Sequence, residues 1–382
     1  MQIRPLAPKG AGRGAGNATL DDFVRVPWAL YRDDPHWIAP LRFERKDALS
    51  PKAPVFDHVQ WQGWVAYDQA GAPVGRITAQ IDSLYEERYG EFVGFFGMLE
   101  APDDQAYFDA LFETAKGWLR ERARTRVLGP FNLNVNQEVG VLVDGFDSPP
   151  YFMMGHHRPY YGTRIEAAGF AGTQDMLAYE IDTERYVVPP VHERLRKRYL
   201  KGLTLRSIDK RKLDDELELM RDIFNDAWSE NWGFVPFTEE EFRTVGKEML
   251  MITPADFLRI AEIDGRGVAF IVLLPNVNAH IADLDGALLP FGWAKLLWRL
   301  KRGPLRSARV PLMGVRSEFH HTRLGPGLSF ALIHSLKEPA IARGVARSEL
   351  SWILESNDGM RSIIESIGGR VSKRYRMYSC DL

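Results

Sequence analysis

Apolar residues recur along the chain with two spacings, one close to 2 and one close to 3.6, which predict alternating strands and helices. In the first half we expect strands at 64–67, 74–81, 91–99, 126–129 and 176–182, and helices at 103–123 and 159–168. Within the longer helix, one face carries Phe108, Leu111, Phe112, Ala115 and Leu119. This helix should therefore bury one side against a sheet.

The second half has the same kind of pattern. We expect strands at 203–208, 257–263, 268–274, 309–315, 349–354 and 375–381, and helices at 213–228, 239–250, 328–337 and 358–366. The second and third strands should form a hairpin that turns at Asp264-Gly265. The predicted order is β-α-α-β-β-β-α-β-α-β.

A repeat relates the two halves of the chain. An offset of 199 residues carries Tyr179 onto Tyr378 and Asp182 onto Asp381, and it aligns residues 165–170 with 364–369. Each half thus ends in a helix, a glycine that stops it and a strand. The sequence predicts two tandem α/β domains with mixed sheets. We expect a flexible tail over 1–20, domains over 21–185 and 203–382, and a linker helix over 186–202.

Composition narrows the function classes. Hydrophobic residues make up 45% and charged residues 26%, as in globular proteins, and the net charge of −2 argues against a nucleic-acid partner. The single cysteine, Cys380, excludes a disulfide framework and fits a reducing compartment. Residues 1–20 lack a secretory pattern, and no apolar run reaches the roughly 18–20 residues of a membrane span. We expect a cytoplasmic protein.

The order of elements and one glycine turn resemble the GNAT acyltransferase superfamily. Before the predicted helix 328–337 the chain reads Thr322-Arg323-Leu324-Gly325-Pro326-Gly327. Family members bind the pyrophosphate of acyl-CoA at Arg/Gln-x-x-Gly-x-Gly/Ala in this place, and here both glycines are present while the arginine is displaced by one position. Glycines let a backbone approach phosphate, and a helix N-terminus favours its charge.

The resemblance implies an acyl-CoA cosubstrate and a set of residues that bind it. They are the end of the preceding strand, the turn and the start of the helix: Val315, Arg316, Arg323, Gly325, Gly327, Leu328 and Ser329. The corresponding place in the first half, 100–104, has no glycine and three carboxylates, which would repel pyrophosphate. The first domain is therefore expected to be a degenerate copy.

Acyl transfer to an amine needs a base and a donor for the oxyanion. The resemblance places a backbone N–H of Val315 or Arg316 as that donor. Candidate bases are Glu318, His320 and His321, with Glu355 after the next strand, and the sequence does not separate them.

Two further positions bear on the chemistry. Asn357 fits an asparagine that family enzymes often carry at the start of the fourth helix. Ile364 stands where they often have a tyrosine that protonates the thiolate, so the sequence departs from the family pattern at this position. No ligand cluster accompanies the histidines, and we expect no metal.

Residues 288–302 predict an amphipathic helix. One face carries Trp293, Leu296, Leu297 and Leu300, and a basic stripe carries Lys295, Arg299 and Arg302. Such a helix suits peripheral contact with an anionic membrane, here the inner membrane, or a cover over an apolar tunnel. An ordinary helix that packs on the core is an equal alternative.

Further motifs resemble tandem GNAT-like proteins that include bacterial ceramide synthases. They are Tyr31-Arg32-Asp33-Asp34-Pro35-His36-Trp37 and the run 128–132, together with the length of the chain. The resemblance implies transfer of a long-chain acyl group from CoA to the amine of a sphingoid base, in sphingolipid biosynthesis. Two alternatives stay open: a transferase for a soluble amine or a peptidoglycan precursor, and a non-catalytic binding or regulatory protein.

Overall fold

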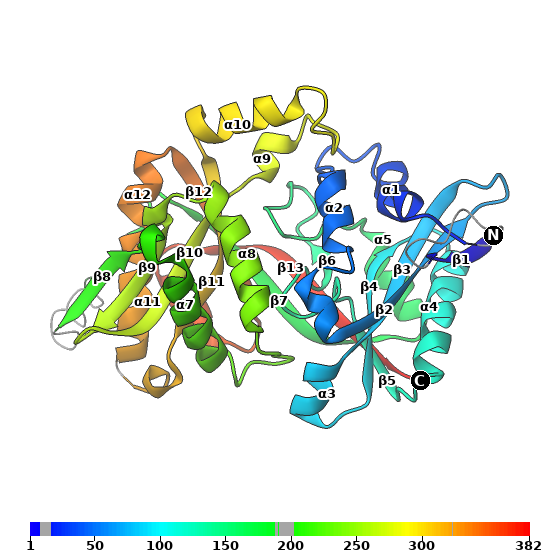
Figure 1. Ribbon diagram of the computed structural model, residues 1–382, viewed down its shortest axis with the longest axis horizontal. Helices are drawn as coiled ribbons and strands as arrows, with labels where there is room; N and C mark the ends of the chain where they lie inside the picture. The colour runs from blue at the N-terminus through cyan, green and yellow to red at the C-terminus, as the bar shows by residue number, and fades with distance from the viewer. Residues whose placement is uncertain (8–16, 188–189, 191–201, 323) are drawn as a thin grey trace. The chain divides into compact units, whose positions relative to one another are not determined.

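The computed structural model describes residues 1–7, 17–187, 190, 202–322 and 324–382 (Figure 1). The chain forms two compact units that are not simple halves of the sequence. Unit 1 contains Met1–Asp175, Ile281–Trp293 and Lys373–Leu382, and unit 2 contains Met176–His280 and Ala294–Ser372. Each has a mixed sheet with helices, which confirms the predicted α/β fold class. The linker helix expected over 186–202 lies mostly outside the described residues.

The sheet of unit 1 has the strand order β1-β2-β3-β4-β5-β13, with β6 beside β13. The strands are β1 Gln2–Pro5, β2 Val59–Tyr67, β3 Pro73–Asp82, β4 Val93–Glu100, β5 Arg126–Gly129, β6 Val141–Asp144 and β13 Arg370–Asp381. The pair β4–β5 is parallel and the others are antiparallel. Strand β1 lies within the residues expected to form a flexible tail. It pairs with β2 because Ile3 packs on the core of unit 1.

The helices of unit 1 are α1 Leu20–Leu30, α2 Arg42–Ala48, α3 Ser83–Tyr89, α4 Gln105–Arg120 and α5 Tyr160–Ala167. Helix α4 confirms the helix predicted at 103–123: its five apolar residues are buried in one cluster with Phe96 and Phe170. The sequence pattern missed α1, whose apolar spacing is interrupted by Pro27 inside the helix. Thr19 caps α1 by accepting a hydrogen bond from Asp22 N.

The sheet of unit 2 has the order β7-β12-β11-β10-β9-β8. The strands are β7 Ala171–Asp182, which enters this unit at Met176, β8 Leu203–Ser207, β9 Leu258–Ile263, β10 Arg266–Pro275, β11 Arg306–Val315 and β12 Val345–Leu354. The pair β11–β12 is parallel and the others are antiparallel. Asp264 and Gly265 both have positive φ, 51° and 79°, which confirms the predicted hairpin turn.

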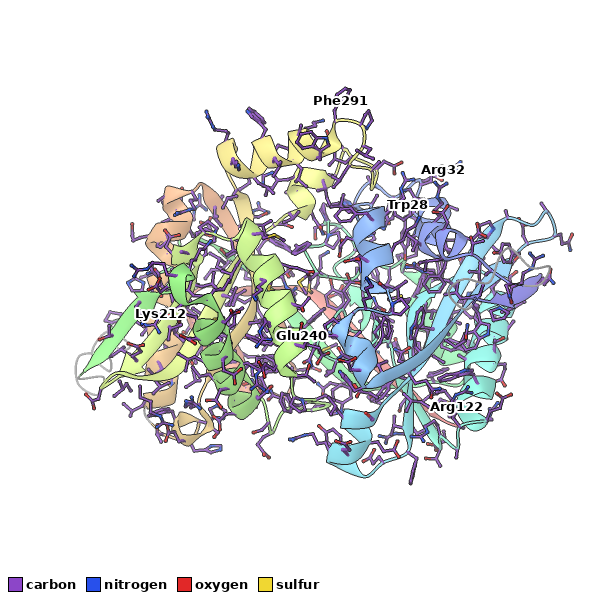
Figure 2. The ribbon with its side chains drawn as sticks, in the orientation of Figure 1. Trp28, Arg32, Arg122, Lys212, Glu240 and Phe291 are labelled. Atoms are coloured by element: carbon purple, nitrogen blue, oxygen red, sulfur yellow. The ribbon has the colours of Figure 1, made fainter. Side chains whose placement is uncertain are left out.

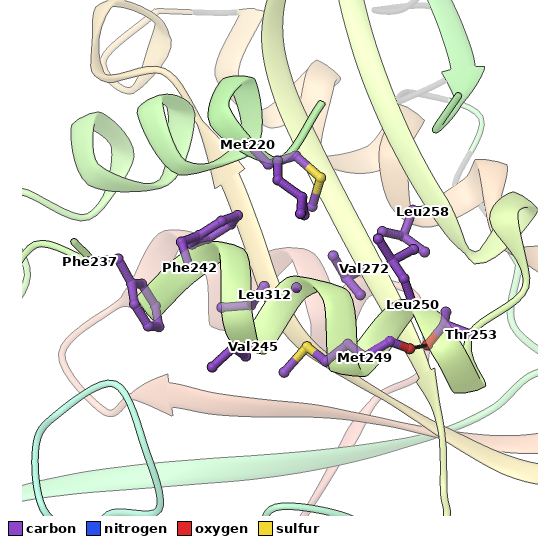
Figure 3. A pocket seen from close by; sticks show the side chains of 12 residues that line it. Met220, Phe237, Phe242, Val245, Met249, Leu250, Thr253, Leu258, Val272 and Leu312 are labelled. Atoms are coloured by element: carbon purple, nitrogen blue, oxygen red, sulfur yellow. Dashed lines mark hydrogen bonds between the residues drawn. The ribbon is translucent and has the colours of Figure 1, made fainter. Parts of the chain in front are cut away.

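Helices cover both faces of the sheet in unit 2. They are α7 Leu213–Ala227, α8 Glu239–Ile252, α11 Leu324–Ser335, α12 Lys337–Ala342 and α13 Asp358–Ser366. Strand β10 alternates between the faces: Ile271 packs with Leu328 of α11, whereas Val272 faces Met220 of α7 and Phe242 of α8 (Figure 3). Helices α7 and α8 therefore lie on one face and α11 on the other. Two further helices, α9 Asn278–Ile281 and α10 Gly292–Arg302, precede β11.

The repeat predicted from the sequence is present in the structure. The bounds of β7 and β13 differ by 199 residues at both ends. Gly169 and Gly368, which precede them, have φ of 89° and 96°, a conformation that favours glycine at the end of a helix.

The two terminal strands are exchanged between the compact units. Strand β13, which ends the chain, pairs with β5 and β6 in unit 1, and β7, which ends the first half, pairs with β12 in unit 2. A repeat shows that two strands are alike but not which partner each takes. The domain bounds 21–185 and 203–382 stay a prediction about the repeat along the chain, whereas the units record which residues pack together.

Deleting Lys373–Leu382 should expose the backbone of unit 1. Strands β5 and β6 would lose their shared partner, so we expect those amides of Arg126–Gly129 and Val141–Asp144 that face β13 to exchange rapidly with solvent. Hydrogen-exchange mass spectrometry measures this. The control is Cys380→Ser, which changes a side chain of β13 and keeps its backbone. Unchanged protection in the deletion variant would contradict the strand exchange.

Candidate functional site

Strands β11 and β12 part in the middle of the sheet of unit 2. Their parallel pairing ends at Val310 and Leu350. Beyond that point β11 continues along β10 to Val315, and β12 continues along β7 to Leu354. A bulge in β11, next to Pro311, accompanies the separation. The result is an opening between two strands that remain part of one sheet.

A large cleft occupies this opening and encloses roughly 1980 Å³, open solvent at its mouth included. Residues at the end of α7, among them Trp228 and Asn231, line it from one face of the sheet, and residues of α11 and α13 line it from the other face. Its walls are mainly apolar: Val310, Met313, Phe330, Leu350, Trp352, Ile353, Met360 and Ile363. The cleft therefore connects the two faces of the sheet through an apolar passage.

The predicted glycine turn forms the first turn of α11 at this cleft. The helix begins at Leu324, four residues before the expected start, and Gly325 and Pro326 line the cleft. A Cβ at Gly325 would lie 2.5 Å from the carbonyl oxygen of Phe319, so only glycine fits without a shift. N–H groups of a first helical turn lack partners within the helix and attract anions. Arg323 lies outside the described residues.

Other residues expected to bind acyl-CoA fall into two groups. Val315 and Ser329 line the cleft, and the Ser329 hydroxyl donates to Gly325 O at 3.2 Å. Gly327 is buried in α11, and Leu328 is part of the hydrophobic core. Arg316 is not among the lining residues.

The hydrogen bonds of Arg316 explain why this residue does not line the cleft. Its N–H donates to Val268 O, and its side chain donates to Gly267 O and to Asp222 Oδ2 at 2.6 Å. The backbone and the guanidinium are both bonded to neighbouring residues of the fold. The structure thus does not bring Arg316 to the cleft.

The three candidate bases lie in different surroundings. Glu318 is exposed, pairs with Arg266 at 2.8 Å and does not line the cleft. His321 lines the cleft and is exposed. His320 also lines it and is exposed, and its Nε2 lies 2.6 Å from Val315 O. A carbonyl oxygen only accepts, so Nε2 carries the proton and Nδ1 of neutral His320 is left as an acceptor.

The ladder between β10 and β11 orients the backbone of Val315. Arg316 N donates to Val268 O, so Arg316 takes a hydrogen-bonded position of this antiparallel pair. Positions alternate, and the N–H and C=O of Val315 therefore point away from β10 toward the opening. The bond between Val315 O and His320 Nε2 agrees with this direction.

Asn357 and Ile364 have structural surroundings. Asn357 lines the cleft and caps α13, its Oδ1 accepting from Met360 N at 3.0 Å. Ile364 is fully buried and packs with Leu177 of β7, so nothing at this position replaces the hydroxyl of the family tyrosine. Glu355, the remaining carboxylate considered from the sequence, is not among the lining residues.

Sequence reasoning missed the aromatic residues of the cleft. Trp228 follows α7 and donates from Nε1 to Met313 O at 2.9 Å, and Trp352 lies on the separated part of β12. Both lie on or beside elements that the pattern predicted. The parting of the strands makes them lining residues, and no spacing in the sequence signals that parting.

The corresponding place in unit 1 is closed. Strands β4 and β5 pair as far as Phe95 and Leu128, and the chain then stays against β4 because Phe131 N donates to Phe96 O at 2.8 Å. A Cβ at Gly97 would lie 1.8 Å from Phe131 O. Backbone thus fills the space that is open in unit 2.

Glu100 occupies the end of β4 in unit 1, where the cofactor turn would follow. It is buried and accepts hydrogen bonds from Tyr31 at 2.9 Å and Tyr161 at 2.6 Å. Burial raises the pKa of Glu100, and the neighbouring Arg76 opposes that shift. The Glu100 carboxylate is thus held by hydrogen bonds from other residues of unit 1.

None of the helices in the described part of the chain is long and apolar enough to cross a membrane. Among the described residues, no group of three or more His, Cys, Asp or Glu residues is placed to hold a metal ion.

Comparison with characterised sequences identifies two relatives of nearly full length. Over 359 residues the chain is 49% identical to Protein YghO of Escherichia coli strain K12, covering 94% of this chain and 92% of that protein. It is 47% identical over 364 residues to bacterial ceramide synthase of Caulobacter vibrioides, covering 94% of both. No family model matches the chain.

Solved structures agree in fold. A tandem GNAT protein from the clavulanic acid biosynthesis pathway aligns with 100% of this chain and 98% of its own, with a TM-score of 0.56 and 15% identity. A GNAT-fold N-acetyltransferase of Sphaerobacter thermophilus covers 99% of this chain and 95% of its own, with a TM-score of 0.54 and 14% identity. The predicted fold of two tandem GNAT-like domains is thus confirmed.

Proposed function

Because this chain belongs to the tandem GNAT-like acyltransferase family that includes bacterial ceramide synthase, we propose that unit 2 transfers an acyl group from acyl-CoA to an amine. The observation that carries the proposal is the cleft between β11 and β12, which reaches both faces of the sheet. A donor can enter beside α11 and an acceptor beside α7. Their reacting groups then meet within the sheet.

The residues of unit 2 fit an acyl-CoA cosubstrate. The first turn of α11 would hold the pyrophosphate, since Gly325 leaves room for close approach and a helix N-terminus favours negative charge. The apolar walls of the passage suit the acyl chain and support a long-chain donor. Among the described residues, the only ionisable side chains that line the cleft are His320 and His321.

His320 serves as the base in this proposal. The amine nitrogen attacks the thioester carbonyl, His320 Nδ1 accepts the proton that the amine loses, and the C–S bond breaks as the C–N bond forms. The N–H of Val315 donates to the carbonyl oxygen as charge develops on it. The departing sulfur takes up a proton.

The acceptor is proposed to be a sphingoid base. The support is the name of the relative from Caulobacter vibrioides, which matches 94% of this chain. An acceptor with a long hydrocarbon tail also suits the apolar passage. These two observations support a sphingoid base over a soluble amine or a peptidoglycan precursor.

Peripheral contact with a membrane forms part of the proposal. No residue of α10 is buried, so this helix does not pack on the core in the described chain. Leu289 and Phe291, 81% and 77% exposed, precede it, and Figure 2 shows Phe291 projecting outward. Trp293, Leu297 and Trp298 are also exposed, as are the cations Lys295, Lys301 and Arg302. Apolar and basic side chains together suit an anionic lipid surface of the cytoplasmic face.

Palmitoyl-CoA should bind the wild-type protein more tightly than acetyl-CoA, because only the longer chain fills the passage. In Gly325→Ala the new methyl group would push against Phe319 O and disturb the turn, at a cost of roughly ten- to a hundredfold in affinity. Titration calorimetry measures both. The control is Gly117→Ala, whose methyl group meets no atom within 4 Å. If the folded wild-type protein binds neither thioester, the proposal is wrong.

His320→Gln should lower kcat about 100- to 10,000-fold, because an amide keeps an N–H for Val315 O but has no basic nitrogen. The KM for acyl-CoA should stay close to the wild-type value. His321→Gln is the matched control. A larger loss in His321→Gln than in His320→Gln would assign the base differently.

The wild-type protein should co-sediment with vesicles of phosphatidylglycerol and much less with vesicles of phosphatidylcholine, and added salt should weaken this binding. Phe291→Ser combined with Trp298→Ser should abolish it. Met251→Ser serves as the control, since Met251 is 80% exposed on α8, outside the segment 288–302. Equal sedimentation of the double variant and the wild type would exclude this surface.

A further inference from the structure

A buried ion pair lies directly below the point where β11 and β12 part. Arg309 and Glu349 are partners in the parallel ladder, one position before its last pair, and are 1% and 0% exposed. Ser351 connects them: its Oγ accepts from Arg309 Nε at 2.8 Å and donates to Glu349 Oε1 at 2.6 Å. A buried ion pair loses its hydration and often contributes little net stability, so this one calls for another explanation.

The contacts of Arg309 converge on the first separated residues of β12. Besides Ser351 Oγ, the guanidinium donates to Ser351 O at 3.3 Å, and its carbon lies 4.7 Å from the ring centroid of Trp352. Ser351 and Trp352 both line the cleft, whereas Arg309 and Glu349 do not. The buried charges therefore contact two residues that line the cleft, Ser351 and Trp352.

We propose that the indole of Trp352 blocks the acyl chain at the point where β11 and β12 part and thereby sets the length of the acyl chain that unit 2 accepts. Arg309 is a positioning residue that holds the ring. The inference rests on the proposed function, since it names the specificity determinant of that site. Trp352 is two positions past the last pair of the parting strands, among apolar residues such as Val310 and Leu350.

The arrangement resists displacement of the ring by a longer chain. Moving Trp352 would break its cation–π contact with Arg309. It would also shift the backbone next to Ser351, whose carbonyl and hydroxyl both bond Arg309. A planar guanidinium with several fixed donors can make these contacts at once, which a lysine ammonium does not reproduce. The ring of Trp352 is thus a rigid stop, and the discrimination by chain length should be sharp.

The test is titration calorimetry of free CoA and of a series of saturated acyl-CoAs of increasing chain length. For the wild type, affinity should rise about fourfold for each added methylene that is buried, up to one length, and then stop rising. In Trp352→Ala the rise should continue to longer chains, while the affinity for free CoA stays unchanged. Trp118→Ala is the matched control: it removes an indole that contacts Arg122 at 3.8 Å in unit 1 and lines no part of the cleft.

A second variant tests the positioning role of Arg309 separately from the bulk of the Trp352 ring. Arg309→Lys keeps a positive charge beside Glu349 but loses the fork that holds Ser351 and Trp352. We expect the limit in chain length to become gradual, with free CoA bound as in the wild type. A limit as sharp as that of the wild type would overturn the role of Arg309.

The outcomes distinguish the inference from the function on which it rests. If the folded wild type binds neither CoA nor any acyl-CoA, the proposed function fails and the inference falls with it. If the wild type binds the series and Trp352→Ala leaves the limit in place, the proposed function stands and Trp352 is not the determinant. A limit that moves equally in Trp118→Ala would also overturn the inference.

Discussion

The exchange of terminal strands is the constraint on which the rest of the structure depends. Strand β12 leaves β11 after Leu350, and its other edge pairs again with β7 at Ile353 and Leu354 after a shift in register. Strand β7 comes from the first half of the sequence. Without that partner both edges of the separated segment would be unsatisfied, which a buried backbone does not tolerate. The opening lies in the second repeat of the sequence, but the strand that supports it, β7, belongs to the first repeat. In return, β13 completes the sheet of unit 1.

The two copies of the repeat show how little distinguishes an open site from a closed one. In both units a parallel strand pair precedes the place of interest. In unit 2 the strands diverge and the following helix begins with glycines, whereas in unit 1 Phe131 returns to the neighbouring strand and Glu100 is bonded by two tyrosines. The difference lies in a few backbone hydrogen bonds and one buried carboxylate. The order of the main elements around this place, strand, helix, strand, is the same: β4, α4 and β5 in unit 1, and β11, α11 and β12 in unit 2.

Much of the fold could be predicted because it depends on local pattern. The turn at Asp264 and Gly265, the buried face of α4 and the bounds of α13 all follow from spacing and from the conformational needs of single residues. The start of α11 was misplaced because Gly325 and Pro326 indicate a loop, although both fit the first turn of a helix.

Features of the site that depend on strand partners could not be predicted. Arg316 was expected at the site and is turned to Asp222, while Trp352 was not considered. One hydrogen bond distinguishes His320 from the other candidate bases, Glu318 and His321. It joins His320 Nε2 to Val315 O, which the pairing of β10 with β11 turns toward the opening.

The carbonyl of Val315 also bears on how the open sheet avoids aggregation. A strand that loses its partner exposes N–H and C=O groups, and such an edge invites pairing with a strand of another chain. Along the free edge of β11, two oxygens are already taken: Trp228 donates to Met313 O and His320 donates to Val315 O. These side chains obstruct a foreign strand without filling the passage. A sheet that opens for its substrate is in this way kept from becoming a template for aggregation.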